Sequence, residues 1–165
     1  MKRLFLAVAL LAACGGGKNV KPSGEVSAPE WVAQGTGAFA VEAGKQLHGV
    51  GTAQAPDAKS RRQQADSAAA QQLAGGVDAL SAALTKMSEQ TQDNLGDAVS
   101  AIAKKAAAQA ASIRDHWVTP DGTEQSLDVL DLTAFRAAVQ SVDGDDKLKR
   151  EMAANAEKAF DSLMR

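Results

Sequence analysis

The sequence predicts an α+β domain in which an antiparallel sheet of about four strands, built from two hairpins, packs on a long helix, with additional helices toward the C-terminus. Two pairs of short segments with β-type residue patterns, each pair joined by a glycine-containing turn, predict the hairpins. Longer segments with apolar residues at spacings of three and four predict the helices. Because the expected order is β-β-α-α-β-β-α-α, we expect the helices to cover one face of the sheet.

The N-terminal segment predicts an export signal that precedes this domain. Lys2 and Arg3 are followed by ten residues, 4–13, without a polar side chain. A helix of that length spans about 15 Å, which is half of a hydrocarbon core of about 30 Å. Residues 1–13 are therefore too short to span a membrane and fit a signal peptide. No later stretch approaches twenty apolar residues.

The only cysteine of the chain, Cys14, follows this segment directly. The sequence Leu-Ala-Ala-Cys at 11–14 resembles a bacterial lipobox, which predicts cleavage between Ala13 and Cys14 and a lipid on the Cys14 sulfur. A diacylglycerol brings two acyl chains, and two chains anchor a protein stably where one binds only marginally. The alternative is an ordinary secretory signal with an incidental cysteine. Gly15 in place of an aspartate indicates, by the enterobacterial sorting pattern, the cell outer membrane.

Composition and charge narrow the range of partners. A lone cysteine cannot form an internal disulfide, so packing alone has to hold the exported domain together. Without Lys2 and Arg3 the chain has 16 basic and 20 acidic residues, a net charge of −4, which indicates neither a nucleic-acid nor an anionic-lipid partner. Residues 14–28 are polar and glycine-rich and predict a flexible membrane tether. Residues 29–165 have the size of a single domain.

The first hairpin is expected from residues 39–42 and 47–53, which flank a glycine-containing turn at 43–45. The two glycines of the stretch Gly-Val-Gly-Thr at 49–52 weaken the second strand. This stretch lacks the third glycine and the lysine of a phosphate-binding loop, so it indicates a close-packed or bulged strand.

A long helix is expected from Asp57 onward. Its apolar face, which we expect to pack against the sheet, has spacings of 4, 3, 4 and 3 and consists of Leu73, Val77, Leu80, Leu84 and Met87. Gly75 and Gly76 within the helix each cost about 1 kcal/mol relative to alanine. They predict either a second backbone close by or a bend. A break at 91–94 precedes a second, alanine-rich helix that runs to about Ala111.

The second hairpin is expected from residues 113–118 and 123–130. The turn between them, Thr-Pro-Asp-Gly at 119–122, has its proline and its glycine where a type I turn favours them. Strand alternation then places the side chains of Ile113, Asp115 and Trp117 on one face of the first strand, and those of Gln125, Leu127 and Val129 on one face of the second.

Two further helices are expected after this hairpin. Asp131 is positioned to cap the first, which carries apolar residues at spacings of three and four up to Val142. Gly144 ends it, and Asp145 or Asp146 caps a last helix, whose apolar residues are Leu148, Met152, Ala156, Phe160 and Leu163. The acidic stretch around Gly144 lacks the alternation and the final glutamate of a calcium loop, so two adjacent helix ends explain it better.

Little in the sequence supports catalysis. Cys14 is the only thiol, and acylation would consume it. His48 and His116 lie 68 positions apart in predicted strands, with no ligand spacing around them, so no metal or other cofactor is expected and both histidines are assigned structural or surface roles. Asp115 and His116 are neighbours on a strand and point to opposite faces, so they cannot form an acid–base pair.

For two pairs of residues, the sequence allows either a structural role or a binding role. Arg61 and Arg62 lie in the first turns of the long helix, where acidic residues are usual. A solvated surface is the default interpretation, and contact with a phosphate or a partner is the alternative. Trp31 and Trp117 are the only indoles, and either can anchor a partner. In a domain with so few aromatic residues, core positions are favoured.

Five stretches, in this order and spacing, carry a family resemblance over residues 29–142: Pro29-Glu30-Trp31-Val32, Leu47-His48-Gly49-Val50-Gly51-Thr52-Ala53, Arg61-Arg62-Gln63-Gln64-Ala65-Asp66, Trp117-Val118-Thr119-Pro120-Asp121-Gly122-Thr123 and Leu127-Asp128-Val129-Leu130. Together they resemble the LPP-twenty (twenty-kilodalton lipoprotein) family of bacterial envelope lipoproteins. The resemblance implies a dodecin-like fold, a sheet wrapped on a long helix, in an outer-membrane lipoprotein without established enzymatic activity that is sometimes tied to flagellar or surface structures. Members often have an aromatic residue where His48 stands and a tyrosine in the second hairpin, whereas this chain has no tyrosine.

The expected function is a non-enzymatic structural or interaction module of the cell envelope, anchored in the outer membrane through the lipid on Cys14. The sequence does not identify its protein partner. A periplasmic small-ligand or peptidoglycan-fragment binding protein is the alternative. A hydrolase is disfavoured because no nucleophile–base pair can be assembled from the sequence. An edge strand of such a small sheet is able to pair with a second copy, so a homo-oligomer remains open.

Overall fold

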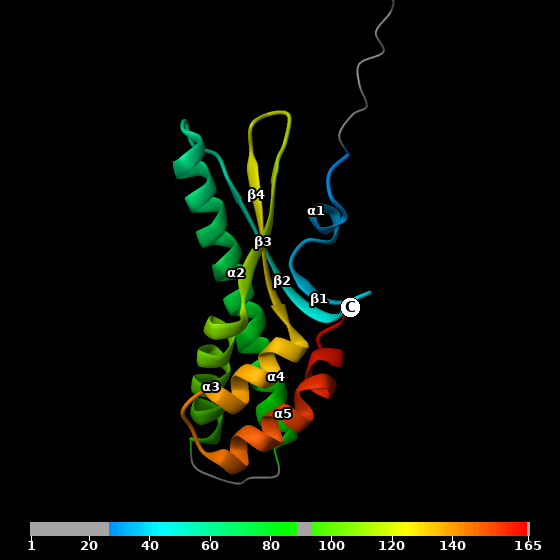
Figure 1. Cartoon of the computed structure of the whole chain (residues 1–165), viewed down its shortest axis with the longest axis vertical. Coiled ribbons are helices and arrows are strands. Elements are labelled where there is room, and N and C mark those ends of the chain that lie inside the picture. The colour runs from blue at the N-terminus through cyan, green and yellow to red at the C-terminus, as the bar shows by residue number, and fades with distance from the viewer. Residues whose placement is uncertain (1–26, 89–93, 165) are drawn as a thin grey trace, which may run out of the picture.

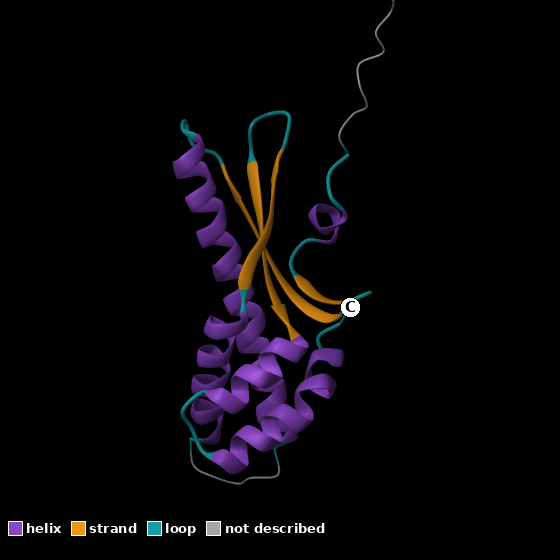
Figure 2. Ribbon diagram, in the orientation of Figure 1, coloured by secondary structure: helices purple, strands orange, loops and turns teal. Residues whose placement is uncertain are grey.

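The computed structural model describes residues 27–88 and 94–164 and confirms the predicted α+β fold (Figures 1 and 2). The predicted signal peptide 1–13, Cys14, most of the tether 14–28 and residues 91–93 of the predicted helix break lie outside the described residues. The elements are α1 (Glu30–Gln34), β1 (Gly37–Val41), β2 (Gly44–Ala53), α2 (Ala58–Met87), α3 (Leu95–Ala110), β3 (Ser112–Val118), β4 (Glu124–Asp131), α4 (Leu132–Ser141) and α5 (Asp146–Asp161).

The four strands form one sheet in the order β1-β2-β4-β3, and all neighbours are antiparallel. Both predicted hairpins are present, and β2 pairs with β4 to join them. At the tip of the second hairpin the Gly122 N–H donates to the Thr119 carbonyl at 2.9 Å, which is the hydrogen bond expected of the predicted β-turn. Gly122 has a φ of 84°, a left-handed conformation that favours glycine.

A β-bulge in β3 corrects the predicted faces of that strand. The pairing shifts between Ile113, which lies opposite Asp128, and Asp115, which lies opposite Leu127. Neighbouring residues of β4 point to opposite faces, so Ile113 lies on the other side of the sheet from Asp115. The prediction that Ile113 shares a face with Asp115 and Trp117 was therefore wrong, because an extra residue in a strand inverts the alternation.

The N-terminal half of α2 lies directly on β2. A Cβ atom added to Gly49 would lie 2.3 Å from the Ala69 carbonyl oxygen, and one added to Gly51 would lie 2.2 Å from the Ala65 carbonyl oxygen. Ala65 and Ala69 are fully buried. Strand and helix backbones therefore touch, which confirms the interpretation of the Gly-Val-Gly-Thr stretch as a close-packed strand.

The two glycines inside α2 differ in what surrounds them. A Cβ on Gly76 would meet the Leu47 side chain at 2.8 Å, whereas a Cβ on Gly75 would meet nothing within 4 Å. The three atoms nearest to a Cβ on Gly76 all belong to the Leu47 side chain, so the closest approach there is by a side chain and not by a backbone. Close backbone approach occurs instead one layer away, at the glycines of β2.

The helices from α2 onward pack on one face of the sheet, as expected, but they cover it unevenly. At 30 residues, α2 is about 45 Å long. Figure 1 shows α3, α4 and α5 gathered around its far half, beyond the end of the sheet. The Asn155 side chain of α5 reaches the Met87 carbonyl at the end of α2. On this face α2 provides most of the helical cover, while α3 and α4 reach only part of β2 and β4. Leu80 and Leu84 belong to the core that α2 shares with α3, α4 and α5.

The predicted caps and apolar faces of the last helices are confirmed. The Asp131 carboxylate accepts hydrogen bonds from the N–H groups of Thr133 and Ala134, and Asp145 accepts one from Leu148. Phe135 of α4 and Phe160 of α5 are fully buried, with ring centroids 6.4 Å apart.

The short helix α1, which the sequence did not predict, covers the other face of the sheet. Trp31 is buried there against Leu127 and Val129, and its indole N–H donates to the Asp115 carboxylate at 2.8 Å. Trp117 is half-buried beside this cluster. The core assignment is thus confirmed for Trp31. In the part of the chain that the structure describes, no helix is long and apolar enough to cross a membrane.

Candidate functional site

The strand β4 turns a polar row toward α2. Glu124, Ser126 and Asp128 are all at least nine-tenths buried on this side, whereas Leu127 and Val129 face α1. The helix α2 therefore packs on the more polar face of β4. The sequence analysis noted only the apolar face, and so it missed the clustering of these three side chains.

Arg61 and Arg62 pair with the first residue of this row. The Arg62 Nε–H donates to Glu124 at 2.9 Å, and Arg61 Nε lies 3.4 Å from the other oxygen of the same carboxylate. The Glu124 side chain is only 3% exposed. The default prediction of a solvated surface is therefore wrong for Arg61, whose side chain is 19% exposed. Arg62 stays at the surface, 57% exposed, while it pairs with the same carboxylate. The charge of buried Glu124 explains the basic first turns of α2.

His116, Asp66 and Ser126 meet in the middle of the row. One oxygen of Asp66 lies 2.7 Å from His116 Nε2 and accepts a hydrogen bond from the Ser126 hydroxyl at 2.6 Å. Asp115 points to the opposite face and bonds Trp31, so the predicted separation of Asp115 from His116 is confirmed. The sequence analysis missed Asp66. Asp66 lies one helical turn after Arg62 and therefore on the same face of α2, which is the sequence signal that could have identified it.

The order of these three groups differs from that of a serine hydrolase. There, imidazole lies between hydroxyl and carboxylate and removes the hydroxyl proton. Here the carboxylate lies in the centre, and Ser126 is fully buried. This arrangement stabilises the α2–sheet contact without activating the hydroxyl.

His48 lies on the other face of the sheet. Its ring centroid is 4.9 Å from that of Phe39, its Nε2 is 3.1 Å from the Gln46 side-chain oxygen, and burial lowers its pKa below the ordinary 6.5. Within residues 27–88 and 94–164, no three His, Cys, Asp or Glu side chains are grouped as metal ligands. His48 and His116 thus lie in separate packing environments.

Replacing His48 with phenylalanine is expected to flatten the pH dependence of stability below neutrality. The unfolded chain takes up a proton near pH 6.5, whereas buried His48 resists it, so stability falls as the pH drops from about 6.5 toward the lowered pKa. Urea titrations at pH 7, 6 and 5 measure this. An unchanged pH dependence in His48→Phe would contradict the assignment.

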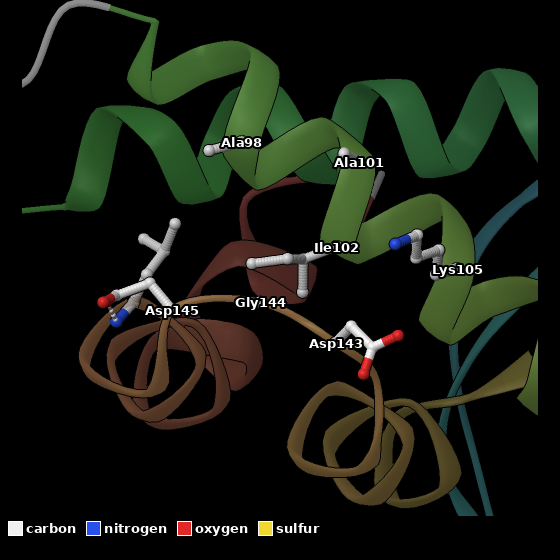
Figure 3. Close-up of a pocket in the computed structure, with 8 residues that line it drawn as sticks. Ala98, Ala101, Ile102, Lys105, Asp143, Gly144 and Asp145 are labelled. Carbon is white, nitrogen blue, oxygen red and sulfur yellow. Dashed lines mark hydrogen bonds between the residues drawn. The ribbon is translucent and has the colours of Figure 1, made fainter.

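The acidic stretch 143–146 forms the junction between α4 and α5, as predicted. Asp145 caps α5, and Asp146 forms an ion pair with Lys149 at 2.9 Å. Gly144 packs closely against α3, because a Cβ added to it would lie 2.8 Å from the Ile102 Cδ1 atom. A cavity of about 210 Å³ remains beside this junction (Figure 3). Lys105 and Asp143 lie on one side of Gly144 in this view and Asp145 on the other, so the charges do not converge on one point.

A second cavity, of about 280 Å³, lies between α2 and α3. Asp128 lines it together with apolar side chains, and the Asp128 Oδ1 atom has no hydrogen-bond partner among the described residues. Burial is the main cause that raises the pKa of Asp128; the Val129 N–H lowers it in part, and the nearby Asp66 carboxylate raises it further. We call this cavity the Asp128 pocket. The sequence analysis did not predict it.

No family model and no curated protein matches the chain. The resemblance to the LPP-twenty family therefore stays a prediction.

Proposed function

We propose that the chain is a lipid-anchored lipoprotein of the bacterial outer membrane that acts as a non-enzymatic structural or interaction module of the envelope. The lipobox-like sequence that ends at Cys14, ahead of a single α+β domain, supports the anchor. The observation that carries the non-enzymatic part is the polar row on β4. Glu124 is paired with two arginines, and the Asp66 carboxylate holds His116 and Ser126 in place.

The anchor is tested by the mass of the N-terminal peptide from a detergent-extracted membrane fraction. We expect a peptide that begins at Cys14 and is heavier by a diacylglycerol, with or without a further acyl chain. The matched variant Cys14→Ser is expected to lose both the modification and the membrane association. An unmodified wild-type peptide, or one that begins elsewhere, would contradict the anchor.

The interaction role is tested by affinity purification from detergent-solubilised envelope. A stoichiometric envelope protein partner, recovered with the wild-type chain and not with an unrelated lipoprotein, is the expected result. Repeated recovery of the chain alone would count against an interaction module.

A small-ligand binding protein of the periplasm is the second candidate function. The Asp128 pocket favours it, because a cavity with a largely apolar lining and one convergent polar group is the usual form of a ligand site. Binding in this pocket is compatible with a lipid anchor, since the two involve different parts of the chain.

A further inference from the structure

We propose that the Asp128 pocket binds a small organic cation, a primary ammonium group on a short apolar body, with the ammonium on the Asp128 carboxylate. This inference deepens the ligand-binding candidate and does not depend on the lipid anchor.

The walls of the pocket determine the body of the ligand. Two helices supply nearly the whole lining, and most of it consists of methyl groups and short apolar side chains: Ala70, Leu73, Ala74 and Val77 from α2, and Ala107, Ala108 and Ala111 from the end of α3. A volume of about 280 Å³ lies just below the range of roughly 300 to 1,000 Å³ usual for ligand sites. A short alkyl or similar apolar group fits these walls.

The carboxylate determines the charge of the ligand. Asp128 is 7% exposed, and its Oδ1 atom has no partner among the described residues. A buried charge is unfavourable unless it is paired, so this group favours a hydrogen-bond donor with a positive charge. An anionic ligand would meet repulsion both from Asp128 and from the Asp66 carboxylate nearby.

The one basic side chain in the lining, Lys104, already has an acidic partner of its own. Its Nζ is 3.0 Å from Asp78, and both side chains are 58% exposed. Arg62 pairs with Glu124, and His116 with Asp66. Asp128 is thus left for a cation from outside.

The end of α3 adds to the negative potential. The helix ends at Ala110 beside the pocket, and its last turn contains no basic residue. The C-terminal end of a helix carries a partial negative charge, which a cation stabilises. A metal ion fits poorly, because Ca²⁺ needs six to eight oxygen ligands and Asp128 is the only acidic side chain in the lining.

Isothermal titration of the detergent-solubilised, full-length protein with n-pentylammonium chloride at pH 7 tests the inference. We expect saturable one-to-one binding, and binding at least tenfold weaker for n-pentanol, which has the same body without the charge. Asp128→Asn, which keeps the shape of the side chain, is expected to weaken n-pentylammonium binding at least tenfold. The matched control Asp97→Asn removes an exposed carboxylate from the other end of α3 and is expected to leave binding unchanged.

Two outcomes would overturn the inference. One is equal affinity for n-pentanol and n-pentylammonium, which would indicate apolar contact alone. The other is unchanged n-pentylammonium binding in Asp128→Asn, which would place the ammonium elsewhere. Ala108→Leu, which fills the mouth of the pocket from an exposed helix position, provides a second check, because it is expected to weaken binding while Asp128 is intact. None of these results bears on the mass of the Cys14 peptide, so the lipid-anchor proposal and the ligand-binding proposal are tested independently of each other.

Discussion

Replacing Gly51 with alanine is expected to destabilise the domain by about 3 kcal/mol or more, a large part of the roughly 5 to 15 kcal/mol by which a domain is usually stable. The added methyl group would lie 2.2 Å from both the Ala65 carbonyl oxygen and the Ala69 nitrogen. These are backbone atoms of α2, so no side-chain rotation relieves the clash, and the helix would have to move away from β2. Gly49→Ala is expected to act in the same direction, because its methyl group would lie 2.3 Å from the Ala69 carbonyl oxygen.

The matched control for this prediction is Gly75→Ala. Gly75 lies inside α2 with nothing within 4 Å of an added Cβ, so alanine there is expected to stabilise the domain by about 0.5 to 1 kcal/mol. Urea unfolding followed by far-ultraviolet circular dichroism measures all three variants. A Gly51→Ala protein with the wild-type midpoint would mean that β2 does not pack directly on α2.

Replacing Asp128 with asparagine is expected to stabilise the ligand-free domain by about 1 to 2 kcal/mol at pH 7, because it removes a buried charge whose Oδ1 atom has no hydrogen-bond partner among the described residues. Burial raises the pKa of this carboxyl above 3.8 in the folded state, so its ionised form opposes folding above that raised pKa. The unfavourable contribution shrinks as the pH falls from the raised pKa toward 3.8, and it is gone below 3.8, where the carboxyl is protonated in both states. The gain from Asp128→Asn is therefore expected to be largest near neutrality and small at pH 4.

Urea titrations of the two proteins at pH 7 and pH 4 test this prediction, with Glu42→Gln as the control, because Glu42 is an exposed carboxyl in the turn of the first hairpin and its replacement is expected to leave the midpoint unchanged. A loss of stability at pH 7 would show that Asp128 has a favourable partner in the folded protein. A variant that is more stable and yet binds n-pentylammonium more weakly would show the exchange of stability for function that is common at binding sites.

Local signals made much of this fold predictable. The caps at Asp131 and Asp145 and the turn that ends at Gly122 depend on hydrogen bonds to residues two or three positions away, and such bonds are specified by the neighbouring sequence. The spacing of the apolar residues likewise predicted the helices, because an apolar face has to be buried whatever it packs against.

The errors concern relations between distant segments. The face of Ile113 depends on a bulge that is defined only against β4. Arg61 was interpreted as a surface residue because its partner Glu124 lies far away in the sequence. The Asp128 pocket depends on the angle between two alanine-rich helices, and alanine spacing alone does not determine whether such helices close together or leave a cavity.

The C-terminal end of the domain lies against its first strand (Figure 1). Met164 forms a bridge with Ala38, and Lys45 of the first hairpin pairs with Glu157 and Asp161 of α5. On a ribosome or in a secretion channel, β1 emerges long before these contacts are available. The edge of the sheet at β1 is thus completed only after α5 has emerged, so the domain reaches its final structure late in biosynthesis. Until then the unpaired edge of β1 is able to pair with other extended chains and needs protection from them.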